Sequence, residues 1–341
     1  MIRRNWLRWL QLVVGLGISA AALYFVFNGI DWEEVSSALR TANYLYLVPA
    51  IAALGLLFTL RTFRWKMLLH PLQNLKFSRL FGTITVAYLI NNTLPFQLGD
   101  LGRAYLLSEL QGVRKSRTLS TVIVERIIDV LTLVVLLVLL VPFIGVPSWA
   151  AIPAAILGVS FLLLGSVALV AALRRHWIIA LVNHLPRFVP QKAKTRLESS
   201  AHSAVDGLSV LSSPALLAQV LAITVLQWLV SAGALYLVMM AFDLDVRFDA
   251  AIFVMIVVSF GFLIPASPGS IGVYHALSVK ALAVYGVERG PALSYAFVAH
   301  LLYYLPPIAI GLLFLWQQQL GWRRLRAITG SAESPSEEVG A

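Results

Sequence analysis

The chain has 341 residues, of which 59% are apolar and 12% are charged, against roughly 25% charged residues in a soluble domain. This composition excludes an ordinary water-soluble globular protein and indicates a polytopic membrane protein. The net charge of +10 lies in short clusters between long apolar runs, so no nucleic-acid partner is expected.

Six apolar segments are long enough to cross a bilayer, whose core of about 30 Å needs roughly 20 helical residues. The first has no typical signal-peptide cleavage site and is taken as a retained span. The predicted full spans are about 7–27, 44–69, 118–141, 149–173, 214–242 and 291–317.

Two further apolar stretches, about 80–94 and 250–264, are shorter and run into Pro- and Gly-rich sequence. Each is followed by another short apolar piece. The pattern predicts two helix–break–helix hairpins, each of which enters and leaves the membrane by the same face.

The placement of basic residues supports this topology, because short cytoplasmic loops collect Lys and Arg. With both hairpins re-entrant, most of the 26 basic residues fall on one side, which predicts a multi-pass cell-membrane protein with both termini cytoplasmic. Residues 1–325 then form one membrane domain, with a cytoplasmic interfacial segment at about 176–213 and a disordered tail at 326–341. The basic clusters on that side are Arg3/Arg4/Arg8, Arg61/Arg64/Lys66/Lys76/Arg79, Arg103/Arg114/Lys115/Arg117, Arg174/Arg175/Arg187/Lys192/Lys194/Arg196 and Arg323/Arg324/Arg326.

The two breaks share one motif, which predicts an internal repeat. The spacing Pro-x3-Gly-x2-Gly occurs at 95–102 and again at 265–272. The topology makes the units, about 80–141 and 250–317, inverted relative to each other. Broken helices at matching places in inverted halves point to a transporter's binding site near the midplane. The predicted fold class is therefore all-α, with six spans and two re-entrant hairpins in an inverted repeat.

The first break carries an anion-binding pattern. A helix that restarts after Gly99-Asp100-Leu101-Gly102 presents free N–H groups and the positive end of its dipole. Arg103 adds a guanidinium suited to phosphate. The alternative is that Arg103 extends to the cytoplasmic headgroups. Asn91 and Asn92 are expected to satisfy backbone groups freed by the break.

The following span contains ionisable residues in the run VIVERIIDVL. Glu125 and Asp129 share a helix face at i,i+4 and need a counter-ion, for which Arg126 and Arg103 are the nearest candidates in the sequence. Intramembrane ionisable residues are candidates for function. The alternative is a structural ion pair that fixes this span against the first hairpin.

The second break contributes Pro268, Gly269 and Gly272, followed by His275. His300 occupies the position equivalent to Arg126. A His pair titrates near neutral pH and is suited to shuttling a proton, whereas the simpler alternative is ordinary hydrogen bonding of buried histidines.

Signals for catalysis are weak. Asp243-Leu244-Asp245 resembles the DxD metal motif of glycosyltransferases, but any short acidic loop gives such a match. The chain has no P-loop, HExxH or GxSxG motif and no Cys. No catalytic residue, metal site or cofactor is therefore predicted.

The runs TLPFQLGDLGRAYLL, VERIID, PASPGSIGVYHAL and AHLLYYLPPIAIG resemble the flippase-like integral membrane domain family, the family of the transmembrane region of lysylphosphatidylglycerol synthase. The resemblance covers roughly residues 10–320. It implies a lipid flippase or transporter. The site residues that it implies are Gly99, Gly102, Arg103, Glu125, Arg126, Asp129, Pro268, Gly269 and Gly272.

Two departures from the family pattern are notable. Many relatives carry Glu in place of His275 and Arg in place of His300. The His pair therefore implies a different response to pH or a different lipid from those of the relatives. The chain also ends about 20 residues after its last predicted span, so aminoacylation of a lipid by this chain alone is not expected.

These observations give one main hypothesis and two rivals. The main one is a non-enzymatic flippase for a phospholipid or a lipid-linked, polyprenyl-phosphate-type molecule, whose phosphate binds at the facing breaks. One rival is a membrane enzyme of lipid-linked sugar or headgroup transfer that uses Asp243 and Asp245. The other is a lipid-binding scaffold for a lipid synthase; a homo-oligomer is a further possible assembly.

Overall fold

The structure is a computed structural model that describes residues 16–24, 26–70, 74–93, 98–174, 202, 205, 208, 212–263 and 267–317. All regular secondary structure in these ranges is helical. Residues 16–24 and 26–27 are helical, and the later elements are α2 (Trp32–Thr41), η1 (Tyr44–Tyr46), α3 (Leu47–Leu69), α4 (Phe77–Thr93), α5 (Gly99–Gln111), α6 (Lys115–Leu140), α7 (Ser148–Leu173), α10 (Pro214–Ala241), α11 (Phe248–Gly261), η4 (Pro268–Ser270), α12 (Val273–Ala283) and α13 (Arg289–Gln317).

Four long apolar helices are able to cross a membrane by length and composition: Tyr44–Leu69, Ser148–Val170, Pro214–Ala241 and Arg289–Gln317. They coincide with four predicted spans. Helix α6 has 26 residues and coincides with a fifth predicted span. It differs from the other four helices because it carries Glu125, Arg126 and Asp129. The chain is thus a multi-pass membrane protein. Of the predicted span 7–27, residues 7–15 and 25 lie outside the described residues.

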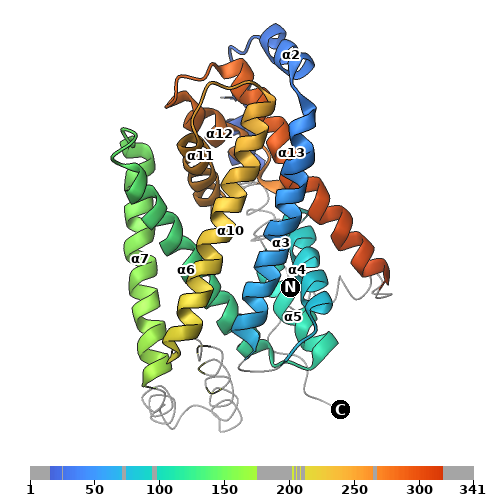
Figure 1. The fold of residues 1–341 in the computed structure, drawn as a ribbon, viewed down its shortest axis with the longest axis vertical. Helices are drawn as coiled ribbons and strands as arrows, with labels where there is room; N and C mark the ends of the chain where they lie inside the picture. Colours follow the sequence, from blue (N-terminus) through green and yellow to red (C-terminus); the bar gives the residue numbers. More distant parts are fainter. Residues whose placement is uncertain are drawn as a thin grey trace, which may run out of the picture.

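Two pairs of shorter helices stand where the sequence predicts hairpins. Helices α4 and α5 have 17 and 13 residues, and α11 and α12 have 14 and 11. At 1.5 Å per residue each measures only about 17–26 Å, less than a bilayer core of about 30 Å. The members of each pair pack together. In Figure 1, α11 and α12 lie in the upper half and α4 and α5 in the lower half.

The breaks themselves lie partly outside the described residues, namely 94–97 with Pro95 and 264–266 with Pro265. The same holds for nearly all of the predicted interfacial segment 176–213 and for the tail 326–341. The structure therefore describes the helices on either side of each break but not the breaks in full.

Close backbone packing joins the C-terminal helix to the first hairpin. A Cβ on Gly311 of α13 would lie 2.8 Å from the carbonyl oxygen of Thr85 on α4, and a Cβ on Gly82 would overlap the Phe314 ring. Glycine at these positions lets α13 lie directly against α4. Helix α7, by contrast, exposes most of its apolar side chains, as expected of a helix at the rim that faces lipid.

A candidate anion pocket beside the first break

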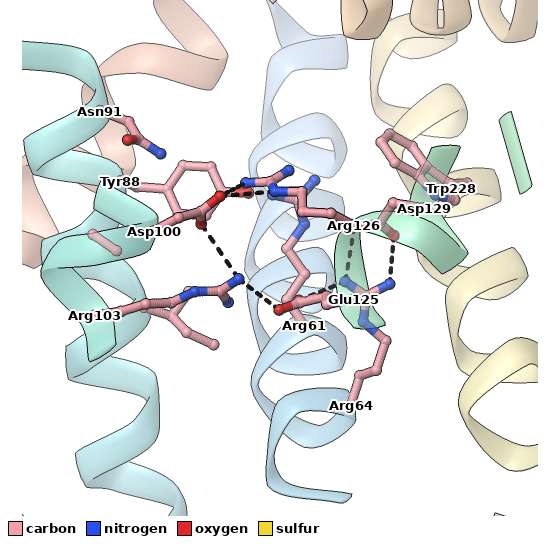
Figure 2. A pocket seen from close by; sticks show the side chains of 12 residues that line it. Arg61, Arg64, Tyr88, Asn91, Asp100, Arg103, Glu125, Arg126, Asp129 and Trp228 are labelled. Carbon is pink, nitrogen blue, oxygen red and sulfur yellow. Dashed lines mark hydrogen bonds and ion pairs between the residues drawn. The ribbon is translucent and has the colours of Figure 1, made fainter. Parts of the chain in front are cut away.

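A pocket lies between five helices. Helices α3, α4, α5, α6 and α10 each contribute at least one side chain, and Figure 2 shows how these converge from both sides. The lining residues are Arg61, Arg64, Ile84, Ala87, Tyr88, Asn91, Asp100, Arg103, Glu125, Arg126, Asp129 and Trp228.

Arg64 is the counter-ion of both carboxylates on α6. Its Nη1 lies 2.5 Å from Asp129 Oδ1, and its Nη2 lies 2.5 Å from Glu125 Oε1. All three residues are buried, with 2% exposure for Arg64. A carboxylate removed from water requires such a charge-assisted partner. The i,i+4 spacing of Glu125 and Asp129 therefore presents both acids to one guanidinium from α3.

Asp100 bridges Arg103 and Arg126. Arg126 donates from Nε to Asp100 Oδ2 at 2.8 Å, and Arg103 Nη2 lies 3.3 Å from Asp100 Oδ1. Arg103 also pairs with Glu125 at 2.7 Å and stacks over the Trp65 ring at 5.1 Å. Arg103 is 5% exposed, so it points into the pocket rather than to the headgroup layer.

The ion pairs form one alternating chain of cations and anions across the pocket, in the order Arg126, Asp100, Arg103, Glu125, Arg64 and Asp129. It contains three guanidiniums and three carboxylates, so the chain of ion pairs as a whole is neutral. Dashed lines in Figure 2 trace its members.

Helix α10 adds neutral polar partners that the sequence analysis did not identify. Gln227 donates from Nε2 to Asp129 at 3.2 Å, and Arg64 donates to the Thr224 hydroxyl at 3.0 Å. Gln227 lies at the middle of the 28-residue α10, so the ionic chain reaches the centre of a membrane-spanning helix. The sequence shows a Thr and a Gln three residues apart in an otherwise apolar helix, but this signal does not identify their partners.

The structure differs from the assignment of Arg61 and Arg64 to a cluster of basic loop residues. Both lie in the pocket, and Arg64 is among the most deeply buried side chains. They fall one turn apart, within the predicted span 44–69. Two arginines on one helix face inside a span are the sequence signal that separates Arg61 and Arg64 from loop residues such as Lys76.

The predicted helix start after Gly102 was also wrong, because α5 begins at Gly99. The Gly102 N–H is already bonded to the Leu98 carbonyl at 2.8 Å and is not available to a ligand. The Gly99 N–H donates to Asn91 Oδ1 at 2.6 Å. Asn91 therefore satisfies a backbone group freed by the break, as predicted.

The second break is built from left-handed glycines. Gly269 has φ 70° within η4 (Pro268–Ser270), and Gly272 has φ 91° immediately before α12. A Cβ on Gly272 would lie 2.6 Å from the Ser19 carbonyl oxygen. Glycine is required there both by the backbone angle and by the close approach of the first helix.

His275 and His300 lie together beside this break. Their ring centroids are 5.0 Å apart, and His300 Nε2 lies 2.9 Å from the Gly269 carbonyl oxygen. The Gly272 N–H approaches His275 Nδ1 at 3.4 Å. Neither His lines the anion pocket, nor do Pro268, Gly269 and Gly272. The candidate site residues thus divide into a pocket group and a second-break group.

Tyr304 of α13 contacts both the end of α4 and the second break. Its hydroxyl donates to the Asn92 carbonyl at the end of α4, at 3.0 Å. Its ring packs against Gly269, because a Cβ on Gly269 would lie only 2.5 Å from the Tyr304 ring carbon Cε2. Helix α4 also packs against η4. The end of α4, before the first break, therefore lies close to η4, after the second break.

The pocket suits anions. Four guanidiniums and three carboxylates line it, and the positive charge in excess favours an anion over a cation. Across the described ranges no group of three or more His, Cys, Asp and Glu side chains is placed to hold a metal ion.

Comparison with known proteins identifies the family. The model of the lysylphosphatidylglycerol synthase TM region matches residues 12–311. The chain belongs to this family. A UPF0104 membrane protein of Methanothermobacter thermautotrophicus is 25% identical over 296 residues, which are 81% of this chain and 85% of the relative. A second UPF0104 protein of that organism is 25% identical over 86% of this chain and 91% of its own length.

A further relative matches only in part. Glycosyltransferase AglD of Haloferax volcanii is 28% identical over 133 residues, which are 39% of this chain and 21% of that protein. Four-fifths of that relative thus lies outside the match.

Proposed function

We propose that this protein moves a phospholipid or lipid-linked molecule between the two leaflets, with the polar headgroup in the anion pocket and the hydrocarbon tails in the bilayer. The observation that carries the proposal is the pocket itself, where four guanidiniums from three helices meet beside a helix break. Membership of the lysylphosphatidylglycerol synthase TM region family is consistent with a lipid ligand.

The cost of this ionic chain supports a functional role. Taking a charge out of water costs several kcal/mol, and apolar residues of similar volume often stabilise a protein equally well. Ionisable groups inside membrane segments typically mark substrate pathways. A charged lipid headgroup crossing the membrane needs the same environment, because it must exchange water for fixed polar partners.

The proposal includes a topology. Helices α4/α5 and α11/α12 would be re-entrant hairpins that enter from opposite faces, and both chain termini would be cytoplasmic. Their short lengths and their places in opposite halves of Figure 1 support this arrangement. In such inverted repeats, rocking of the halves opens a central site to alternate sides. His275 and His300 would then balance charge at the second break.

Lipid movement in reconstituted vesicles tests the function. Wild-type protein should speed the loss of fluorescence of inner-leaflet NBD-phosphatidylglycerol when dithionite is added outside, because the probe reaches the outer leaflet. Arg103→Gln and Arg126→Gln should abolish this movement. Arg79→Gln is the control, since Arg79 is exposed and bonds to Gln111 outside the pocket. Unchanged lipid movement in both pocket variants would contradict the proposal that the headgroup binds in this pocket.

The partial match to a glycosyltransferase supports a second candidate, transfer of a lipid-linked sugar. A donor site would then be expected at Asp243 and Asp245, in the loop between α10 and α11. Alanine at both positions should leave lipid movement unchanged if the protein is a flippase. Loss of sugar transfer to a polyprenyl-phosphate acceptor in that double variant would favour the enzyme instead.

A further inference from the structure

Arg61 is left out of the alternating ionic chain. It lies one turn before Arg64 on α3 and lines the same pocket. In the described part of the chain, no carboxylate lies within ion-pair distance of Arg61, and its buried Nε has no hydrogen-bond partner. The neighbouring guanidiniums of Arg64, Arg103 and Arg126 each contact at least one acid.

Two aromatic rings hold Arg61 in place. Its guanidinium carbon lies 5.1 Å from the centroid of Tyr88 and 6.0 Å from that of Trp228. The faces of aromatic rings attract a cation and fix its orientation. They carry no net charge, however, so Arg61 has no carboxylate partner of its own in direct contact.

The pocket therefore has an excess of one positive charge. Among its described lining residues there are four guanidiniums and three carboxylates. An uncompensated buried charge is strongly unfavourable. A ligand with one negative charge would make the filled pocket neutral, whereas a doubly charged ligand would leave it negative.

We propose that the pocket selects a headgroup with a single negative charge, a phosphodiester, whose phosphate oxygens bind Arg61 between Tyr88 and Trp228. This inference deepens the proposed function and rests on it. Asn91, one turn after Tyr88 on α4, also lines the pocket. Its Oδ1 is occupied by the Gly99 N–H, so its amide nitrogen is the group that can donate to a phosphate oxygen.

Binding to the purified full-length protein in detergent tests the charge rule. Native mass spectrometry would compare phosphatidylglycerol, a phosphodiester with one negative charge, with phosphatidic acid, a monoester that carries between one and two at neutral pH, and with zwitterionic phosphatidylcholine. Phosphatidylglycerol should bind most tightly. Equal affinity for all three would overturn the inference.

Two variants shift the charge in opposite directions. Arg61→Gln removes the excess and should weaken phosphatidylglycerol binding by about tenfold or more, the usual cost of a charge-assisted bond. Asp100→Asn raises the excess to two and should reverse the order, so that phosphatidic acid binds more tightly. Arg79→Gln, an exposed charge removal, should leave the order unchanged. An unaltered order in Asp100→Asn, or unaltered affinity in Arg61→Gln, would refute the rule.

A soluble competitor identifies the source of the phosphodiester. Glycerophosphoglycerol carries the same headgroup without acyl chains, and it should compete far more weakly than the lipid. Equal competition would support the charge rule and contradict a lipid cargo. Charge-selective binding with no movement in vesicles would refute the proposed transport alone, whereas movement without charge selectivity would refute this inference alone.

Discussion

Arg64 holds Asp129 with both ends of its guanidinium fork. Nη1 lies 2.5 Å from Oδ1 and Nη2 lies 3.1 Å from Oδ2. This bidentate geometry is specific to arginine, because the ammonium of lysine is a point charge. The pair joins α3 to α6 at the centre of the protein, so both the charge and the shape of the side chain matter.

Arg64→Gln should therefore be strongly destabilising. It leaves Glu125 without one partner and Asp129 without its cation, and breaking a buried ion pair in this way costs about 3–5 kcal/mol. Thermal unfolding in detergent should show a large drop in Tm. Arg64→Lys should recover only part of it. The double variant Arg64→Gln/Asp129→Asn should be more stable than the sum of the single changes predicts, and strict additivity would contradict the pairing.

A second prediction concerns the close approach of the two helices at the first break. A Cβ on Gly99 would lie 2.0 Å from the Ala87 carbonyl oxygen, and this backbone atom cannot turn away. Gly99→Ala should therefore separate α5 from α4 and cost about 1–3 kcal/mol, as overpacking typically does.

Gly55→Ala is the matched control for Gly99→Ala. Gly55 is exposed on α3, and a Cβ there meets nothing within 4 Å. Alanine favours helix over glycine by about 0.5–1 kcal/mol, so this variant should be neutral or slightly more stable. A comparable loss of Tm in both variants would show that the contact at Gly99 is not the cause.

The ionic residues of α6 and the two breaks were predictable from the sequence because each violates an apolar pattern. Glu125 and Asp129 stand out in a 26-residue apolar helix, and paired Pro and Gly motifs mark the breaks. Arg61 and Arg64 were assigned to a cluster of basic loop residues because they lie near the end of α3, where basic residues usually signal topology. Only the packing of α3 against α6 shows that they face inward.

The start of α5 was missed for a related reason. Gly99 and Gly102 are poor helix formers, so the sequence favours a later start. The structure uses Gly99 as the first helical residue because its bare backbone fits against Ala87. The role of Gln227 and Thr224 was likewise not predictable, since their partners Arg64 and Asp129 come from distant helices.

A third prediction concerns the connection between the two breaks. Tyr304→Phe removes the hydroxyl that donates to the Asn92 carbonyl and should cost about 0.5–1.5 kcal/mol. Hydrogen–deuterium exchange should rise at the C-terminal turn of α4. Tyr44→Phe removes a comparable bond, from the Tyr44 hydroxyl to the Leu39 carbonyl, and should leave that turn unchanged. Equal exchange in the two variants would contradict a Tyr304 connection.

The last prediction tests the re-entrant topology. The chain has no Cys, so single introduced cysteines report accessibility without background. Ser37→Cys, Ser78→Cys and Ser148→Cys place a thiol at exposed sites on α2, at the start of α4 and at the start of α7. If α4 and α5 form a re-entrant hairpin, an impermeant maleimide added to intact cells should label positions 37 and 148 but not 78. If that pair instead crosses the membrane, α6 runs in the opposite direction and position 148 becomes inaccessible. Labelling at 37 with protection at 148 would therefore refute the hairpin, whereas labelling at both with protection at 78 would place α6 and α7 as the inverted repeat requires.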